Sequence, residues 1–173
     1  MYNLTERENE IFSILDKLSA ENLEFIIVGG YAVSAYKHRF SVDADIVIKE
    51  KDIGMFEKIL KSEGFKKQQT RDLGDVYASK FARYEKKDFF ISIDLLINAL
   101  VSRTTNASFS FELLFENSEI KKVIGAEKEI KARIPDKEII IAMKLHSGRL
   151  TDFRDIAALG KDTNIDKIQK LIT

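Results

Sequence analysis

Residues 25–48 read FIIVGGYAVSAYKHRFSVDADIVI, and this stretch decides the expected fold. It begins with an apolar run rich in β-branched residues, which predicts a buried strand, and two glycines follow. About ten residues that can form a short helix come next. A second apolar strand then opens with Asp43 and Asp45, whose side chains share one face because side chains alternate along a strand. The predicted order is therefore strand, glycine turn, helix, and strand with two carboxylates.

Asp43 and Asp45 stand apart from the other closely spaced acids of the chain. The other pairs lie among charged or polar neighbours, as on a solvated face; they are Glu6/Glu8, Glu8/Glu10, Glu50/Asp52, Glu127/Glu129 and Asp136/Glu138. Asp43 and Asp45 instead open an apolar strand, where two carboxylates repel each other and are costly to bury without a partner. A divalent cation resolves that conflict, and hard oxygen ligands suit magnesium. The pair is therefore a candidate metal site.

The two glycines allow two interpretations. Gly29 and Gly30 lack the spacing of a dinucleotide-binding fingerprint, and the chain has no Gly-Lys-Ser/Thr of a P-loop. They can form a tight turn with no further role. Glycine at a helix start also lets backbone N–H groups approach a phosphate, with assistance from the helix dipole. Both interpretations stay open when the glycines are considered alone.

Together, the glycines and the acids resemble a known signature. Val28-Gly29-Gly30, followed by Asp43-Ala44-Asp45 between apolar residues, resembles the pattern of the polymerase-β-type nucleotidyltransferase superfamily. Arg39-Phe40-Ser41-Val42-Asp43 resembles the Arg-x-Ser/Thr-x-Asp lead-in of its AbiEii-like toxin branch and of related minimal nucleotidyltransferases. The resemblance covers about residues 23–160. It implies transfer of a nucleoside monophosphate from a nucleoside triphosphate to an acceptor hydroxyl, and a metal-free α/β domain is the alternative.

A third acid stands alone in a strongly apolar strand predicted at residues 89–97. Because a carboxylate is rarely buried without a partner, Asp94 is either a hydrogen-bonded structural residue or a functional one. In the superfamily that the chain resembles, a third metal-binding carboxylate comes from a neighbouring strand, and Asp94 matches that position. The resemblance thus implies that Asp43, Asp45 and Asp94 hold two Mg²⁺ (or Mn²⁺) ions, and that Asp94 accepts the acceptor's proton.

The resemblance also implies nucleotide contacts and partners. An ion pair of Arg39 with Asp43 or Asp45 is an equal alternative to a phosphate contact. The acceptor is an RNA end, a protein side chain or a small molecule, and a cognate antitoxin is a further expected partner. The candidate nucleotide-binding residues are Gly29, Gly30, Arg39, Ser41 and Lys144.

Residues 144–156 resemble a C-terminal segment of the family, with one departure. That segment has a helix lysine, a turn, and an Arg-x-Lys-Asp-x-x-Asp-Ile-like run that opens the next helix. Thr151 stands where lysine is common, so Lys144 or Arg149 would have to take over a phosphate contact. Thr151 also predicts an N-cap for a helix over 152–160, which could explain the acids of its first turn without any chemistry. The matched positions are Arg149, Asp152, Asp155 and Ile156.

The remaining pattern predicts an α/β (α+β) fold, with a small mixed β-sheet, flanking helices mostly on one face, and C-terminal helices. Apolar stripes predict helices over 5–20, 52–62, 135–149, 152–160 and 164–172. Alternation predicts strands over 65–70, 77–84, 89–97, 119–124 and 128–134, with turns at 72–75 and 85–88. Residues 109–115 fit a short helix or an irregular segment. We expect a nucleotidyltransferase core with an N-terminal packing helix over 1–134 and a helical extension over 135–173, in one compact unit.

Composition bounds the function. The 173 residues carry 28 Lys and Arg against 28 Asp and Glu, and this balance argues against a wholly basic nucleic-acid binder. The absence of cysteine excludes disulfides and thiolate metal sites. No apolar run approaches the roughly twenty residues that cross a membrane, and the N-terminus lacks an apolar signal core. We therefore expect a cytoplasmic protein without membrane contact.

Two other classes of function remain open. A catalytically silent nucleotide-binding or antitoxin-like regulator could keep the fold, although a pure scaffold has no need for clustered carboxylates. A two-metal nuclease also uses paired acids, but it does not require a glycine turn ahead of the acidic strand. Label transfer, strand cleavage, or neither would separate the three classes.

Overall fold

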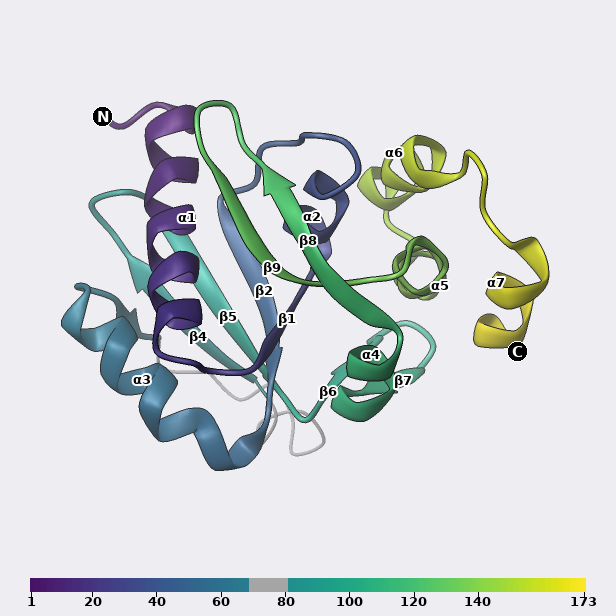
Figure 1. Cartoon of the computed structure of the whole chain (residues 1–173), viewed down its shortest axis with the longest axis horizontal. Helices are drawn as coiled ribbons and strands as arrows, with labels where there is room; N and C mark the ends of the chain where they lie inside the picture. Colours follow the sequence, from purple (N-terminus) through teal and green to yellow (C-terminus); the bar gives the residue numbers. More distant parts are fainter. Residues whose placement is uncertain (69–80) are drawn as a thin grey trace.

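The computed structural model describes residues 1–68 and 81–173 (Figure 1). In these residues the central element is a mixed sheet with the strand order β3-β4-β5-β2-β1-β9-β8. Its strands are β1 (Phe25–Val28), β2 (Asp43–Ile48), β3 (Lys66–Lys67), β4 (Phe81–Lys86), β5 (Ile91–Ile97), β8 (Ser118–Ile124) and β9 (Glu129–Pro135). A separate pair is formed by β6 (Ala99–Val101) and β7 (Ser108–Ser110). The α/β fold with a mixed sheet is confirmed.

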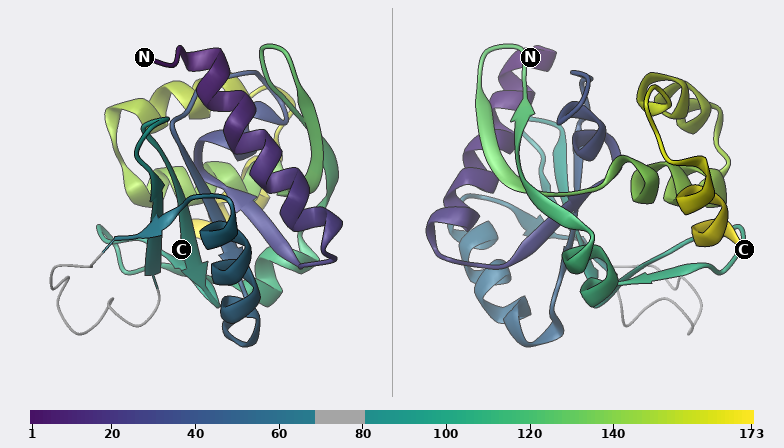
Figure 2. Two further views of the ribbon diagram at one scale, coloured as in Figure 1. Left: turned by 90° about the vertical axis from the view of Figure 1, so that its left-hand side faces the viewer. Right: turned by 45° about the vertical axis from the view of Figure 1, so that its right-hand side comes forward.

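Helices lie on both sides of this sheet (Figure 2). On one side are α1 (Leu4–Ala20) and α3 (Ile53–Ser62), which follows a short 3-10 turn at Glu50–Asp52. On the other side are α5 (Lys137–Ser147), α6 (Leu150–Leu159) and α7 (Ile165–Ile172). Between β1 and β2 lies α2 (Gly29–Ser34), and α4 (Phe111–Glu116) follows β7. The helices are thus less one-sided than expected.

Alternation along the central strands divides the core into two clusters. Ile27 and Ile46 belong to the larger cluster with the apolar stripe of α1. Ile26 and Val47 point the other way and pack with residues of α4 and α5. The expected strand character of residues 25–28 and 43–48 is therefore confirmed, and both strands are buried on both faces where their side chains are apolar.

The β4–β5 hairpin differs from the sequence prediction by two residues. The turn was expected at 85–88, but β4 continues to Lys86 and β5 begins only at Ile91. Phe89 stacks on Tyr2, and Phe90 adopts a positive φ of 52° in the turn. Phe89 therefore packs locally rather than in the strand, whereas Phe90 is exposed in the turn. The predicted turn at 72–75 and parts of the predicted strands 65–70 and 77–84 lie outside the described residues.

Several boundaries in the C-terminal half also differ. The undecided segment 109–115 divides between β7 and α4, and the short strand β6 was not predicted. Pro135 does not open a helix: it ends β9, paired with Ser118, and Asp136 is the N-cap of α5. Thr151 is not an N-cap either, because α6 begins one residue before it, at Leu150. The proposed division of the chain at residue 134 stays a prediction.

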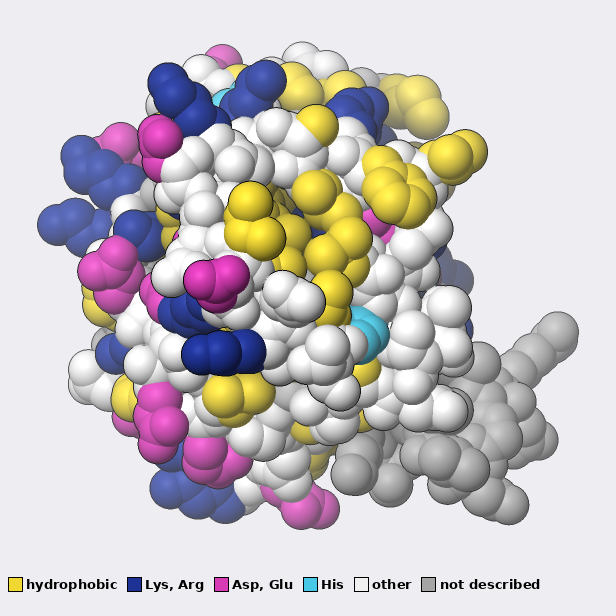
Figure 3. Space-filling model, turned by 90° about the vertical axis from the view of Figure 1, so that its right-hand side faces the viewer, with side chains coloured by type: hydrophobic (Ala, Val, Ile, Leu, Met, Phe, Trp, Pro, Cys, Tyr) yellow, Lys and Arg dark blue, Asp and Glu magenta, His cyan; other side chains and the backbone are white. Residues whose placement is uncertain are grey.

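The side of the molecule that carries α5, α6 and α7 exposes hydrophobic side chains (Figure 3). The large ones on these helices are Leu145, Leu150, Phe153, Ile165 and Ile172. In contrast, Ile168 and Leu171 of α7 pack against the two core clusters. None of the helices in the described ranges combines the length and the apolarity that crossing a membrane requires.

Candidate active site

Strand pairing brings the three predicted acids to one face of the sheet. β2 and β5 run parallel, with Asp45 opposite Asp94 and Asp43 opposite Ser92. Side chains at paired positions of neighbouring strands point to the same face, and neighbouring strands lie about 4.8 Å apart. The expectation that β5 lies beside the strand of Asp43 and Asp45 is confirmed, and the carboxylates of Asp45 and Asp94 are direct neighbours.

The glycine turn lies directly against this acidic face. Gly29 begins α2 with a φ of +67°, and a Cβ atom added to it would lie only 2.3 Å from Oδ2 of Asp45. A Cβ atom on Gly30 would lie 3.2 Å from Cβ of Ser41 and 3.4 Å from Cζ of Arg39. The first glycine is therefore required by both its backbone conformation and its neighbour. The start of α2 borders the carboxylate of Asp45 closely.

Asp43 and Asp45 carry no ion pair with any residue of the described ranges. Ser92 Oγ donates a hydrogen bond to Oδ1 of Asp43 at 2.7 Å. Burial, together with repulsion from Asp94 and Asp43, raises the pKa of Asp45 to about 7. Two adjacent carboxylates without a cationic partner suit a divalent cation with oxygen ligands. The residues present thus fit the Mg²⁺ or Mn²⁺ that the resemblance implies.

Asp94 has a cationic partner that the sequence analysis missed. Arg83, its register neighbour on β4, donates from Nε to Oδ1 at 2.8 Å and from Nη2 to Oδ2 at 2.7 Å. In residues 1–68 and 81–173 no three His, Cys, Asp or Glu side chains are grouped to hold a metal ion. The three-aspartate cage is therefore not assembled while Arg83 holds Asp94, and the role of Asp94 as a metal ligand stays a prediction.

The predicted phosphate contacts Arg39 and Lys144 meet at another carboxylate. Arg39 Nη1 pairs with Oδ2 of Asp155, so the alternative of an ion pair with Asp43 or Asp45 is wrong. Lys144 Nζ, which is buried, donates to Oδ2 of Asp155 at 2.7 Å and to Oδ1 of Asp152 at 3.2 Å. Asp155 therefore joins the loop before β2 to α5, a role beyond helix capping.

Arg149 and Asp152 complete this charged cluster. Arg149 donates to the two carboxylate oxygens of Asp152 from Nε at 2.9 Å and from Nη2 at 3.2 Å. Burial would raise the pKa of Asp152, but hydrogen bonds from Arg149 and the charge of Lys144 lower it to about 2. The side chain of Arg149 stays 71% exposed, whereas that of Lys144 is 6% exposed. Arg149 is thus the cation of this cluster that remains accessible.

Ser41 shapes the loop that leads into the acidic strand. Its Oγ donates to the carbonyl oxygen of Asp43 at 2.9 Å, and Tyr31 donates its hydroxyl to the carbonyl of Ser41 at 2.5 Å. Burial is the main reason that the pKa of Tyr31 is raised, so this tyrosine stays a donor. The structure therefore shows Ser41 as a residue that fixes the entry into β2, next to Gly30.

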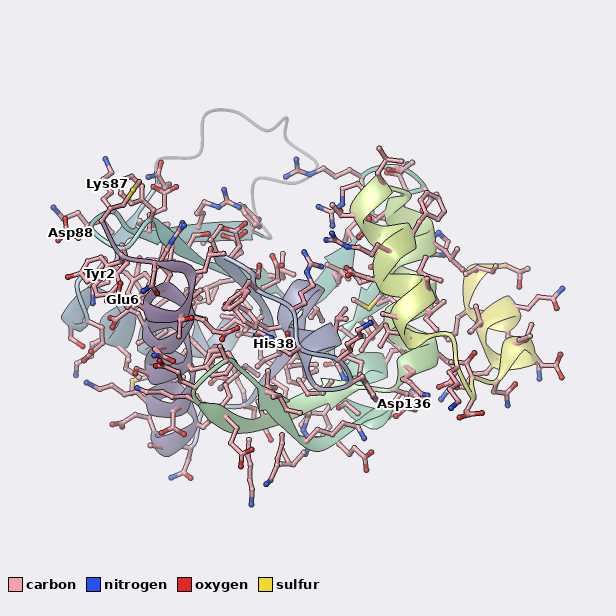
Figure 4. All side chains as sticks on the ribbon, turned by 90° about the horizontal axis from the view of Figure 1, so that it is seen from above. Tyr2, Glu6, His38, Lys87, Asp88 and Asp136 are labelled. Carbon is pink, nitrogen blue, oxygen red and sulfur yellow. The ribbon has the colours of Figure 1, made fainter. Side chains whose placement is uncertain are left out.

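Two cavities meet at Asp43. The first, of about 540 Å³, is lined by Gly29 and by charged residues that include Asp45 and Arg149, and its apolar wall includes Leu100, Phe109 and Met143. The second, of about 670 Å³, extends along the β4–β5 hairpin toward Lys87 and Asp88, at the end of the molecule opposite α5–α7 (Figure 4). Asp43 and Arg83 line both cavities. Two ligands could therefore approach the carboxylate of Asp43 from different sides.

Comparison with solved structures identifies the fold. The antibiotic-resistance factor ANT(2'')-Ia matches with a TM-score of 0.69 and 18% identity over 98% of this chain and 91% of its own. The lincosamide antibiotic adenylyltransferase LnuA, solved with lincomycin, matches with a TM-score of 0.61 and 18% identity over 90% and 98%. An antigenic nucleotidyltransferase-like protein from Paracoccidioides brasiliensis matches with a TM-score of 0.54 and 17% identity over 98% and 87%.

Neither a protein-family model nor a curated protein matches the sequence. The structural matches extend over nearly the whole chain on both sides, and the proteins that they name are nucleotidyltransferases or similar to them. At these sequence identities the likeness concerns the fold alone. In this chain, that fold brings together the acids of β2 and β5 and the glycine that begins α2. This chain therefore has the fold of the nucleotidyltransferases.

Proposed function

We propose that this protein transfers a nucleoside monophosphate from a nucleoside triphosphate to an acceptor hydroxyl. The observation that carries the proposal is the placement of Asp43, Asp45 and Asp94 on one face, beside the glycine start of α2, where two cavities meet. One cavity can take the nucleotide and the other the acceptor. Such an arrangement suits an in-line displacement, in which the nucleophile and the leaving group lie on opposite sides of the phosphorus.

In this proposal Asp43 and Asp45 hold the divalent cation, Mg²⁺ or Mn²⁺. The cation would supply neutralisation of the phosphates and of the charge that develops on the leaving pyrophosphate. The acceptor hydroxyl forms a bond to the α-phosphorus as the bond to pyrophosphate breaks. Asp94 accepts the hydroxyl proton at a carboxylate oxygen once that oxygen is free of Arg83.

The geometry changes which residues we propose for the phosphates. Lys144 is buried between Asp152 and Asp155, so its ammonium is already engaged. Arg149 lines the first cavity, stays accessible, and its charge lowers the pKa of Asp45. We therefore propose Arg149, with the backbone at Gly29 and Gly30, as the triphosphate contact. Arg39, Ser41 and Lys144 would position these groups.

For the acceptor, we propose only a chemical class. Fold neighbours were solved with lincomycin and with adenylyl-2''-tobramycin, which are small hydroxylated molecules. The second cavity, with Glu85, Asp88 and Lys87 among its residues, could admit such a molecule or the end of a larger one. The alternative acceptors in this proposal are an RNA end and a protein side chain. The proposal also includes a role as a cytoplasmic toxin with a cognate antitoxin.

The test is label transfer. Purified protein is incubated with Mg²⁺ and each α-labelled nucleoside triphosphate, together with aminoglycosides and lincosamides, total RNA, or a protein extract. We expect label in one acceptor class with the wild type and none with the Asp43→Asn/Asp45→Asn double variant. Triphosphate binding without transfer would indicate a catalytically silent regulator, and shortened RNA would indicate a nuclease; either result would contradict the proposal.

A further inference from the structure

The ion pair between Arg83 and Asp94 engages one of the three acids of the candidate active site. The guanidinium donates two parallel hydrogen bonds, at 2.8 and 2.7 Å, to the two oxygens of one carboxylate. This two-point contact is the strongest common arrangement of an arginine and a carboxylate. The side chain of Asp94 is 4% exposed and that of Arg83 is 40% exposed. The carboxylate is therefore fixed inside the protein, while the guanidinium has a path to solvent.

Asp94 is also the one carboxylate of the three that has a cationic partner within residues 1–68 and 81–173. Burial raises the pKa of Asp94, and the hydrogen bonds and charge of Arg83 oppose that effect. Asp45, the register neighbour of Asp94, has no such partner, and its pKa is raised to about 7. Arg83 thus stabilises the charged form of the carboxylate that lies deepest in the cluster.

The formal charge of the cluster fits this arrangement. Three carboxylates and one guanidinium have a net charge of −2, which one divalent cation neutralises. With the guanidinium displaced, three negative charges remain, which suits a second cation that arrives with a triphosphate. Within residues 1–68 and 81–173 the guanidinium of Arg83 donates hydrogen bonds to Asp94 alone, and Arg83 lines both cavities, so its side chain has room to move aside.

We propose that Arg83 is a positioning residue that competes with the metal for Asp94, so that the third carboxylate joins the site only when the guanidinium is displaced. This inference rests on the proposed function, because it needs a metal at Asp43 and Asp45. It goes beyond that function by naming what occupies Asp94 in the metal-free protein. Metal affinity without nucleotide is then set by the ion pair as well as by the ligands.

The test is Mn²⁺ binding, followed by the loss of the free-ion signal in electron paramagnetic resonance. Arg83→Gln should bind Mn²⁺ at least about tenfold more tightly than the wild type, because Asp94 becomes available as a ligand. Lys87→Gln is the matched control: it also removes one positive charge from the second cavity, but Lys87 has no ion-pair partner among the described residues. Its affinity should stay within about twofold of the wild type because an exposed charge acts weakly.

A double variant assigns the gain to Asp94. In Arg83→Gln/Asp94→Asn the gain in Mn²⁺ affinity should disappear, because the carboxylate that the loss of Arg83 sets free is then missing as well. An Mn²⁺ affinity of Arg83→Gln equal to that of Lys87→Gln, or weaker than that of the wild type, would overturn the inference.

The Asp43→Asn/Asp45→Asn variant distinguishes a failure of the proposed function from a failure of the inference about Arg83. If it binds Mn²⁺ as well as the wild type does, the proposed function fails, and if only the Arg83 effect is missing, the further inference alone fails.

Thermal unfolding keeps the test valid if Arg83→Gln is destabilised. Removing one partner of a buried pair leaves an uncompensated charge, so its melting temperature without metal should be lower than that of the wild type. Mn²⁺ should then raise the melting temperature of Arg83→Gln by more than it raises that of the wild type, because at a given concentration a tighter-binding ligand stabilises the folded state more. A variant that stays unfolded at saturating Mn²⁺ would show the pair to be purely structural and would overturn the inference.

Discussion

The carboxylate of Asp45 occupies the space that a side chain at Gly29 would need. The position of a Cβ atom on Gly29 lies 2.3 Å from Oδ2 and 3.2 Å from Cγ of Asp45. Val28 and Asp45 are register partners on antiparallel strands, so the turn into α2 is pressed against the acid by the sheet itself. The glycine turn and the acidic pair are therefore one structural unit, although thirteen residues lie between Gly29 and Asp43 along the chain.

The first prediction concerns Gly29→Ala. The methyl group would displace Asp45, and the positive φ adds a strain of about 1–2 kcal/mol. Because a small displacement of a catalytic group is costly, nucleotide transfer should fall at least about a hundredfold. The control is Gly54→Ala in α3, where nothing lies within 4 Å of the added Cβ atom and where alanine favours the helix. Similar transfer rates for the two variants would show that Gly29 is only a turn residue.

The second prediction concerns pH and Asp45. Its pKa in the folded protein is about 7, above the value of about 4 expected in an unfolded chain. The unfolded state therefore loses this proton first, and the folded state becomes relatively less stable as pH rises from about 4 to about 7. Asp45→Asn should remove this loss, so that the metal-free variant is more stable than the wild type above pH 7 by on the order of 4 kcal/mol.

Denaturant unfolding of both proteins between pH 4 and 8, with a chelator present, measures this difference. Saturating Mg²⁺ should reverse the order, since it stabilises only the protein that can bind it. A stability difference that does not change with pH would contradict the raised pKa.

The third prediction concerns the buried cluster around Lys144. Lys144→Met removes the ammonium between Asp152 and Asp155, and it should lower the free energy of unfolding by about 3–5 kcal/mol, because two buried carboxylates lose a partner. Lys122→Met is the control. Its ion pair with Glu129 is exposed on both sides, and such pairs contribute about 1 kcal/mol or less. Equal losses for the two variants would show that the cluster is not structural.

The fourth prediction concerns Arg149 as the residue that contacts the triphosphate. Arg149→Gln should weaken binding of a nucleoside triphosphate about tenfold or more and leave adenosine binding unchanged, because a charge-assisted contact to phosphate is lost. Arg154→Gln, in the helix that Arg149 caps, is the control: Arg154 is exposed and has no ion pair with described residues. Calorimetry measures both. Equal loss for adenosine and the triphosphate would place Arg149 away from the phosphates.

Much of the site could be predicted because its parts follow local rules. Alternation along a strand placed Asp43 and Asp45 on one face, and the register of β2 with β5 then brought Asp94 beside them. The single acid in an apolar strand was a sufficient signal for Asp94. These inferences needed only strand geometry and the cost of burying charge.

The partners of the charged residues could not be predicted in the same way. Arg83 faces Asp94 only because the hairpin turn lies at 87–90, and a turn two residues earlier, as expected, would change the register. The pairing of Arg39 with Asp155 spans 116 residues and depends on how α6 lies against the loop before β2. The run of alternating Phe81, Arg83 and Glu85 on one face of β4 was the signal that could have directed attention to Arg83.

The most direct measurement of the central claim is the release of pyrophosphate from a nucleoside triphosphate in the presence of Mg²⁺ and acceptor, with the α-phosphate followed by its label. We predict that the wild type releases one pyrophosphate for each labelled nucleoside monophosphate that appears on the acceptor. We predict that Asp43→Asn/Asp45→Asn releases none while it remains folded. Release of inorganic phosphate instead of pyrophosphate, or an equal rate from the double variant, would contradict nucleotide transfer at these carboxylates.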